Sequence, residues 1–294
     1  MSREILLQTT LKNPIKISGT GLHTGGQSSI QLKPAPAGAG IVFSSKEVLI
    51  PALTENVVDT KRSTTLGKNG VQIKTVEHLL SACRGLGVDN VSVDVEGADE
   101  LPAFDGSSWP YVQALRQAGI IQISGQPKPV LEYQSKESFV FKSGLSSYKV
   151  LPGSKLTLGV SISFPKTPIG IQDYEYELSD SYAEEISKAR TFCLESEVEA
   201  LHQAGLAKGG NLSNTIVVGA QSFQCDEPLR YPNEFARHKI LDLLGDLSLM
   251  GPGTYRFHAL VFAPSHTNNW RFAQELRKRL TAPKEILEGL KTKI

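Results

Sequence analysis

The sequence feature that most constrains the fold is a strict alternation of apolar and polar residues, and it occurs in both halves of the chain. Residues 91–96 read VSVDVE, and residues 156–164 read LTLGVSISF. A period of two is typical of antiparallel strands that turn one face to the core and the other to water. We therefore expect a sheet with one dry face in each half.

A break between the halves lies in residues 123–133, ISGQPKPVLEY, where one glycine and two prolines stand close together. Helices and central strands tolerate such a cluster poorly. We therefore expect two domains, residues 1–126 and residues 130–294, and the length of 294 residues also suits two domains.

Helical periodicity in each half predicts helices that cover the dry face of each sheet. They are expected at residues 76–84, 110–118, 183–190, 235–249 and 270–280. Antiparallel-rich sheets covered by helices define the α+β class, so we predict two related α+β domains.

Composition argues against two classes of partner. The chain has 31 Lys and Arg residues against 30 Asp and Glu residues, so no general positive field attracts nucleic acid. Residues 1–14 lack the apolar run of a signal peptide, and no segment of the sequence approaches the ~20 apolar residues of a membrane helix. We therefore expect a cytoplasmic protein without stable membrane insertion. Its three cysteines, Cys83, Cys193 and Cys225, show no metal-binding spacing and are expected as reduced thiols.

The segment RHKILDLLGD, residues 237–246, combines a helical apolar rhythm with ionisable side chains. On a helical wheel His238, Lys239, Asp242 and Asp246 fall within about 100°, and the leucines and the isoleucine occupy the opposite face. A histidine and an aspartate four residues apart can both reach one divalent ion, and imidazole with carboxylate suits zinc. An exposed histidine–aspartate hydrogen bond is the simpler alternative.

Two further fragments supply the other groups that a zinc hydrolase needs. Glu77 and His78 stand together in TVEHLLSAC at the start of a predicted helix, and His266 follows an apolar strand in the loop APSHTNNWR. Each alone is more simply explained as a surface or capping residue. Together, His78, His238 and Asp242 make three ligands, Glu77 a base and His266 a proton donor. Because both halves contribute, the active site is expected at the domain interface, with the helices packed between the two sheets.

Residues 192–218 look like an addition to the second domain. Helical periodicity in residues 195–204 is followed by a loop with three glycines and by the apolar residues 216–218. Inserted elements with glycine loops often build binding surfaces, although an ordinary crossover would look the same.

A series of motifs resembles a known family: GTGLHTG, TVEHLLSA, LPAFDGSSWP, KARTFC, RHKILDLLGDL and SHTNN. Over most of its length the chain resembles the zinc-dependent UDP-3-O-acyl-N-acetylglucosamine deacetylases of lipid A biosynthesis. The resemblance implies hydrolysis of the N-acetyl group of UDP-3-O-(3-hydroxyacyl)-N-acetylglucosamine, the committed step of that pathway. The products would be acetate and UDP-3-O-(3-hydroxyacyl)-glucosamine. The expected partner is thus a small UDP-linked acylated amino sugar, and the expected state a monomer.

The resemblance also implies a metal site and a base. His78, His238 and Asp242 match the family's metal ligands, which would hold Zn²⁺ and could also hold Fe²⁺. Glu77 matches the general base that takes a proton from water.

Further roles are implied around that site. His266 matches the group that protonates the leaving amine, and Asp246 matches the carboxylate that orients it. Thr191 and Lys239 match residues that contact the acetyl oxyanion or the sugar and phosphates. His23 matches a histidine near the site, although a histidine between glycine-rich turns is equally a turn residue.

The insertion matches the family's apolar passage for the acyl chain of the substrate. Phe192, Leu206 and Gly210 are expected to contact that chain. Other apolar residues of the segment would supply walls or pack in the core: Leu194, Leu201, Ile216 and Val217.

The chain departs from the family in RSTTL, residues 62–66, where some members carry a cysteine. Two other functions stay open: a metal-dependent hydrolase of another acylated sugar or amide, and a non-catalytic binding module of similar fold. The near-neutral charge and the lack of a phosphate-binding glycine loop disfavour the binding module.

Overall fold

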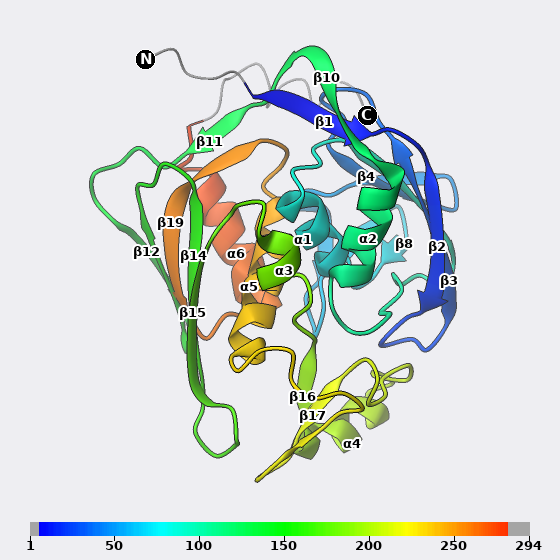
Figure 1. Cartoon of the computed structure of the whole chain (residues 1–294), viewed down its shortest axis with the longest axis vertical. Coiled ribbons are helices and arrows are strands. Elements are labelled where there is room, and N and C mark those ends of the chain that lie inside the picture. The colour runs from blue at the N-terminus through cyan, green and yellow to red at the C-terminus, as the bar shows by residue number, and fades with distance from the viewer. Residues whose placement is uncertain (1–5, 282–294) are drawn as a thin grey trace.

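The computed structural model describes residues 6–281 and has helices packed between two large sheets (Figure 1). The first sheet has the order β2-β3-β9-β4-β5, with strands β2 (Ile15–Thr20), β3 (Gln27–Pro34), β9 (Val91–Gly97), β4 (Ile41–Ser45) and β5 (Val48–Pro51). The second has the order β12-β13-β19-β14-β15, with strands β12 (Phe139–Ser143), β13 (Ser146–Leu151), β19 (Thr254–Phe262), β14 (Leu156–Phe164) and β15 (Gly170–Glu177).

Smaller elements complete the fold. Short strands pair outside the two sheet orders: β1 (Leu7–Leu11) with β10 (Ile120–Pro127), β11 (Val130–Glu132) with β19, β6 (Val57–Asp59) with β7 (Thr65–Lys68) and β8 (Val71–Ile73), and β16 (Phe192–Leu194) with β17 (Ile216–Val218) and β18 (Phe223–Gln224). The helices are α1 (Glu77–Gly85), α2 (Trp109–Ala118), α3 (Tyr182–Glu185), α4 (Glu195–Gln203), α5 (Glu234–Ser248) and α6 (His266–Arg277), and a 3₁₀ turn, η1, covers Thr54–Asn56. No described helix is both long and apolar enough to cross a membrane.

The two large sheets have the same topology. We count the five strands of each sheet in chain order. The first strand pairs antiparallel with the second, and the second pairs antiparallel with the fifth. The fifth pairs parallel with the third, and the third pairs antiparallel with the fourth. In each half one helix directly precedes the last strand and another follows it, so α1 corresponds to α5 and α2 to α6. The predicted α+β class with two related halves is confirmed.

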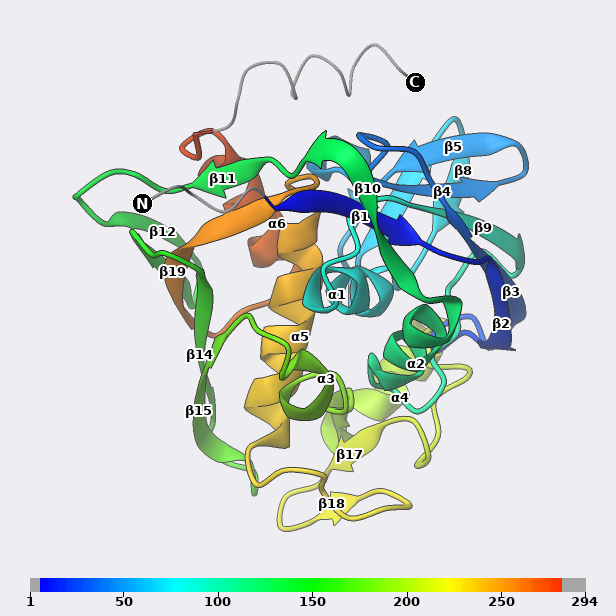
Figure 2. The same ribbon diagram turned by 45° about the horizontal axis from the view of Figure 1, so that its top comes forward.

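Helices from both halves meet between the sheets. α5 packs on β14 and β15 of the second sheet and on α1, while α1 packs on α2 (Figure 2). The strand alternation explains the layers, because Val91 and Val93 in β9 and Leu156 and Leu158 in β14 are buried on the inner faces. Gly159 is buried although the pattern placed it on the wet face, since the Leu260 side chain lies over it.

Two predicted helices differ from the structure by more than one residue at an end. The helix expected at residues 183–190 is the short α3, because the chain must turn to bury the Arg190 guanidinium against Glu234. The last helix begins at His266 instead of residue 270, because the Ser265 hydroxyl accepts a hydrogen bond from the Asn268 backbone N–H and caps it.

Strand pairing changes partner near residues 127–129, where the sequence predicts a division of the chain. The division into two domains stays a prediction. β10 pairs with β1 of the first half, whereas β11 pairs with β19 of the second. The outer ends of the proposed domains 1–126 and 130–294, residues 1–5 and 282–294, lie outside the described residues. The three-stranded sheet of the proposed insertion includes β18, which lies beyond residue 218.

Candidate active site

Three groups of a kind that binds metals meet where the two halves touch. His78 lies in the first turn of α1, and His238 and Asp242 lie one turn apart on α5. One ligand atom from each residue lies within 4.8 Å of the others, and all three side chains are buried. The structure thus brings together the three residues that the sequence singled out.

A glycine on α5 allows this approach. A Cβ added at Gly245 would lie 2.8 Å from the carbonyl carbon of Glu77 and closer still to its oxygen. The first turn of α1 therefore rests directly on the backbone of α5, and any side chain at position 245 would separate the two helices.

Hydrogen bonds orient the three groups. His238 Nδ1 lies 3.1 Å from the Ala189 carbonyl oxygen. Because a carbonyl only accepts, Nδ1 carries the proton, and Nε2 keeps its lone pair. Nε2 of His238 and Nε2 of His78 lie 3.4 and 3.6 Å from the same oxygen, Oδ1 of Asp242.

Asp242 has one oxygen that fits a cation. Its Oδ2 accepts a hydrogen bond from Lys239 Nζ at 2.8 Å. Its Oδ1 is buried, and no hydrogen-bond donor among the described residues reaches it. A buried carboxylate oxygen without a donor is costly, so its position between two imidazole nitrogens fits a bound cation.

The ionisation states of these three side chains also suit a bound cation. Burial lowers the pKa of His238 to about 3, so the ring is neutral at neutral pH. Burial acts to raise the pKa of Asp242, but the neighbouring His238 and Lys239 outweigh it and hold that pKa well below its ordinary value. Neutral imidazole and ionised carboxylate are the forms that bind zinc.

Glu77 stands beside this cluster as a buried carboxylate. Its Oε2 accepts a hydrogen bond from the Thr64 backbone N–H at 3.0 Å, and its Oε1 lies 3.9 Å from His266 Nε2. Burial raises the pKa of Glu77 above its ordinary value. A positioned carboxylate with a raised pKa is suited to accepting and passing on a proton.

His266 and Asp246 form a hydrogen-bonded pair. Nδ1 of His266 lies 3.0 Å from Oδ2 of Asp246, which is fully buried on α5. Burial acts to lower the pKa of His266, but the charges of Asp246 and Glu77 outweigh it and raise that pKa to about 9. The imidazole is therefore protonated at neutral pH and can donate a proton from Nε2. The prediction that His266 lies in a loop was wrong, because it is the first residue of α6.

Sequence reasoning missed three residues, Thr64, Asn269 and Glu100, that hold Asp246 or the turn at His23 in place. The Thr64 hydroxyl donates to Asp246 Oδ1 at 2.6 Å, and Asn269 Nδ2 donates to Asp246 Oδ2 at 2.8 Å. Glu100 accepts hydrogen bonds from the backbone N–H groups of His23 and Thr24. The only available signal was for Asn269, which lies three residues after His266 and hence on the same face of its helix.

His78, His238 and Asp242 line one cavity of about 450 Å³ between the halves, together with Glu77 and His266. Asp246 is not among the described residues that line it. Thr191, Phe192, Lys239 and His23 line it as well. Lys239 Nζ lies 5.3 Å from the centroid of the Phe192 ring. His23 is buried, and neither ring nitrogen has a hydrogen-bond partner among the described residues. Burial lowers the pKa of His23.

Two residues of the expected acyl contacts do not reach this cavity. Leu206 and Gly210 are absent from its lining among the described residues. Their loop instead pairs with the turn at His23, because the Lys208 N–H donates to the His23 carbonyl at 3.2 Å. Leu201 and Ile216 are buried in the core.

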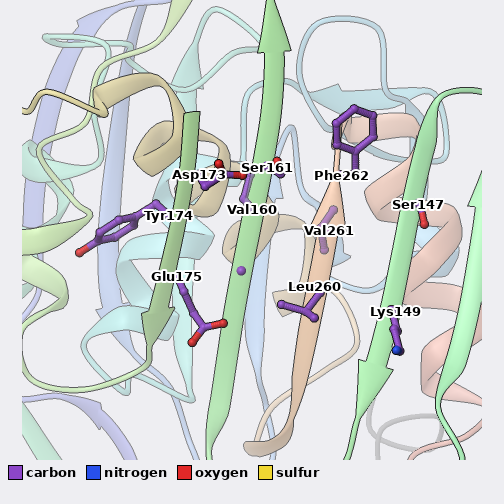
Figure 3. A pocket seen from close by; sticks show the side chains of 11 residues that line it. Ser147, Lys149, Val160, Ser161, Asp173, Tyr174, Glu175, Leu260, Val261 and Phe262 are labelled. Atoms are coloured by element: carbon purple, nitrogen blue, oxygen red, sulfur yellow. Dashed lines mark hydrogen bonds between the residues drawn. The ribbon is translucent and has the colours of Figure 1, made fainter. Parts of the chain in front are cut away.

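A larger hollow of about 540 Å³ lies on the outer face of the second sheet (Figure 3). Leu260 and Phe262 on β19 stand between Lys149 on β13 and the carboxylates Asp173 and Glu175 on β15. Among the described residues that line it there is no histidine. The cavity between the halves, which gathers the ionisable groups, is therefore the better candidate for an active site.

Comparison with known proteins places the chain among the deacetylases, a class of enzyme that such a cavity suits. A family model described as "UDP-3-O-acyl N-acetylglycosamine deacetylase" (LpxC) matches residues 8–278. The chain belongs to this family.

Individual members are similar over nearly their whole length. The UDP-3-O-acyl-N-acetylglucosamine deacetylase of Teredinibacter turnerae is 42% identical over 285 residues, which cover 94% of this chain and 91% of that protein. The enzyme of the same name from Sulfurimonas denitrificans is 39% identical over 279 residues, 93% of this chain and 92% of its own. The enzyme of the same name from Myxococcus xanthus is 39% identical over 274 residues, which cover 92% of this chain and 86% of that protein.

Proposed function

We propose that the chain hydrolyses the N-acetyl group of UDP-3-O-(3-hydroxyacyl)-N-acetylglucosamine with a metal ion held by His78, His238 and Asp242. The observation that carries this is Asp242 Oδ1, a buried oxygen without a donor among the described residues that faces two imidazole nitrogens. The expected metal is Zn²⁺, and Fe²⁺ suits the same ligands. When bound, such an ion supplies a Lewis acid that polarises the acetyl carbonyl and makes water a nucleophile at neutral pH.

The residues around that cluster divide the proton transfers. Glu77 accepts a proton as water attacks the acetyl carbon, and the Thr64 N–H holds its carboxylate in place. His266 donates a proton to the amide nitrogen as the C–N bond breaks, which makes an amine the leaving group. Asp246 keeps the His266 ring oriented and charged.

Other cavity residues would bind the substrate. Lys239 and Thr191 contact the developing oxyanion or the sugar and phosphates, and His23 lies at the same cavity. Phe192, Leu206 and Gly210 remain proposed contacts of the acyl chain, of which Phe192 lines the cavity. Each methylene buried there would contribute about 0.8 kcal/mol. A cytoplasmic location and a monomeric state stay predictions.

The test combines a deacetylation assay with metal analysis of the purified chain. We expect one metal ion per chain, release of acetate from the UDP-linked substrate, loss of activity on chelation and recovery with Zn²⁺. The Glu77→Gln variant keeps an acceptor for the Thr64 N–H, so it should keep its metal while kcat falls about 10²- to 10⁴-fold. Glu197→Gln is the matched control, because Glu197 lines the same cavity but pairs with Arg62 at 2.9 Å.

Each alternative function predicts a different result. A metal-loaded chain that turns over another acylated sugar or amide, but not this substrate, would be a different hydrolase. A chain without stoichiometric metal, on which Glu77→Gln has no effect, would be a binding module. Retention of kcat in Glu77→Gln by an otherwise active enzyme would remove Glu77 from the mechanism.

A further inference from the structure

The carboxylate of Asp246 accepts hydrogen bonds from three donors in two separate parts of the chain. Oδ1 accepts from the Thr64 hydroxyl, and Oδ2 accepts from both His266 Nδ1 and Asn269 Nδ2, at 3.0 and 2.8 Å. His266 and Asn269 are three residues apart on α6 and therefore reach the same oxygen from the same helix face. Asn269 is the only one of these donors whose two polar ends could exchange places.

Tyr148 on β13 bonds to the end of the Asn269 amide that faces away from Asp246. The Tyr148 hydroxyl lies 2.7 Å from Asn269 Oδ1, and both side chains are buried. Burial raises the pKa of Tyr148 far above its ordinary value, so the hydroxyl keeps its proton and donates. Because a carboxylate can only accept, Nδ2 must point to Asp246, and this leaves Oδ1 to accept from Tyr148.

A reversed amide would place Oδ1 against the Asp246 carboxylate. Two acceptors would then face each other in a buried site, which costs more than the loss of one hydrogen bond. The carboxylate would turn or shift to avoid this contact, and the His266 ring bonded to it would follow. The second sheet thus reaches the proton donor through a chain of three hydrogen bonds, from Tyr148 to Asn269, Asp246 and His266.

We propose that Asn269 is a positioning residue for the reaction and that Tyr148 holds its amide in place, so that Asp246 keeps the His266 ring in one orientation. The inference rests on the proposed function, because it assigns both residues an effect on the proton donor of that reaction. Both residues are proposed to act through these hydrogen bonds and not through packing alone.

Two variants test the proposal by steady-state kinetics. Asn269→Ala removes the donor to Asp246 and should lower kcat about ten- to hundredfold, with KM and metal content close to wild type. Tyr148→Phe removes only the hydroxyl, and its ring keeps the stacking on Phe272, whose centroid lies 4.5 Å away. It should therefore fold normally and lower kcat about three- to tenfold.

Double variants separate a positioning role from a general structural one. If Asn269 acts through Asp246, then Asn269→Ala should cause no further loss of kcat in an Asp246→Ala background, and Tyr148→Phe none in an Asn269→Ala background. Asn268→Ala is the matched control on the same helix, because its amide bonds to Ser146 Oγ and the Ser143 carbonyl and should leave kcat unchanged.

The outcomes are distinguishable from failure of the proposed function. A wild-type chain that does not release acetate contradicts the function itself. An active wild-type enzyme whose Tyr148→Phe and Asn269→Ala variants keep full kcat contradicts the positioning role alone. Losses that multiply in the Asp246→Ala background would also overturn it, because the two residues would then act independently of Asp246.

Discussion

Replacing Gly245 by alanine sets two effects of known size against each other. Alanine in a helix interior is more favourable than glycine by about 1 kcal/mol, because it restricts the unfolded chain. In this structure the new Cβ would lie 2.8 Å from the Glu77 carbonyl carbon and closer to the oxygen, well inside the 3.0 Å limit of real Cβ contacts. Those atoms are backbone and cannot rotate away, so α1 must move.

We estimate that α1 and α5 must separate by roughly 1 Å, with an overpacking cost of about 1–3 kcal/mol. After the gain in helix propensity, the net loss of stability is on the order of 1 kcal/mol, or a few degrees in Tm. The effect on activity is larger, because Glu77 and His78 move with α1 while His238 and Asp242 stay on α5. A misplacement of about 1 Å costs on the order of 100-fold in rate.

The assay is kcat/KM for acetate release together with metal affinity and thermal unfolding of the same protein sample. We expect Gly245→Ala to lose metal affinity and about 100-fold in kcat/KM while it remains folded. If the variant instead melted about 2–4 °C higher with unchanged metal affinity and activity, the gain in helix propensity would exceed the cost of overpacking. The tight contact between the helices would then not control the site.

Three further outcomes are expected. His238→Ala should lose stoichiometric metal and activity together, as measured by metal analysis and acetate release, because one of three ligands is gone. The activity of the wild type should fall on the alkaline side, at or below about pH 9, as His266 loses its proton. In Asp246→Ala this fall should occur at a lower pH, because the Asp246 charge helps to raise the pKa of His266. Arg190→Ala should destabilise the fold by about 3–5 kcal/mol in thermal unfolding, because it leaves the Glu234 carboxylate buried without its partner. An unchanged Tm in that variant would show that Glu234 finds another donor.

The elements that local periodicity governs could be predicted from the sequence. The period of two in residues 156–164 predicts β14, and the stripe of ionisable residues on residues 237–246 predicts that one face of α5 is polar. That face meets α1 and α6 instead of solvent, so His238, Asp242 and Asp246 are buried. The pattern gave the face of the helix but not what covers it.

The supporting hydrogen bonds could not be predicted because they join distant segments. Thr64 is 182 positions from Asp246, and Tyr148 is 121 positions from Asn269. Serine, threonine and asparagine are common on surfaces, so nothing local distinguishes a threonine that holds a buried carboxylate from one that faces water. The short α3 was mispredicted for a similar reason, since the ion pair of Arg190 with Glu234 overrides helical periodicity.

The repeated topology explains why the cluster lies between the halves. α1 and α5 precede equivalent strands of equivalent sheets, and the two helices pack on each other. Each half must cover its own sheet with such a helix, so the contact between them follows from the fold and needs no ligand. The proposed ligands are unevenly divided, however, because α1 contributes His78 while α5 contributes His238 and Asp242. Neither half alone can supply three ligands, so a metal bound there would hold the two halves together and would bind weakly to either half in isolation.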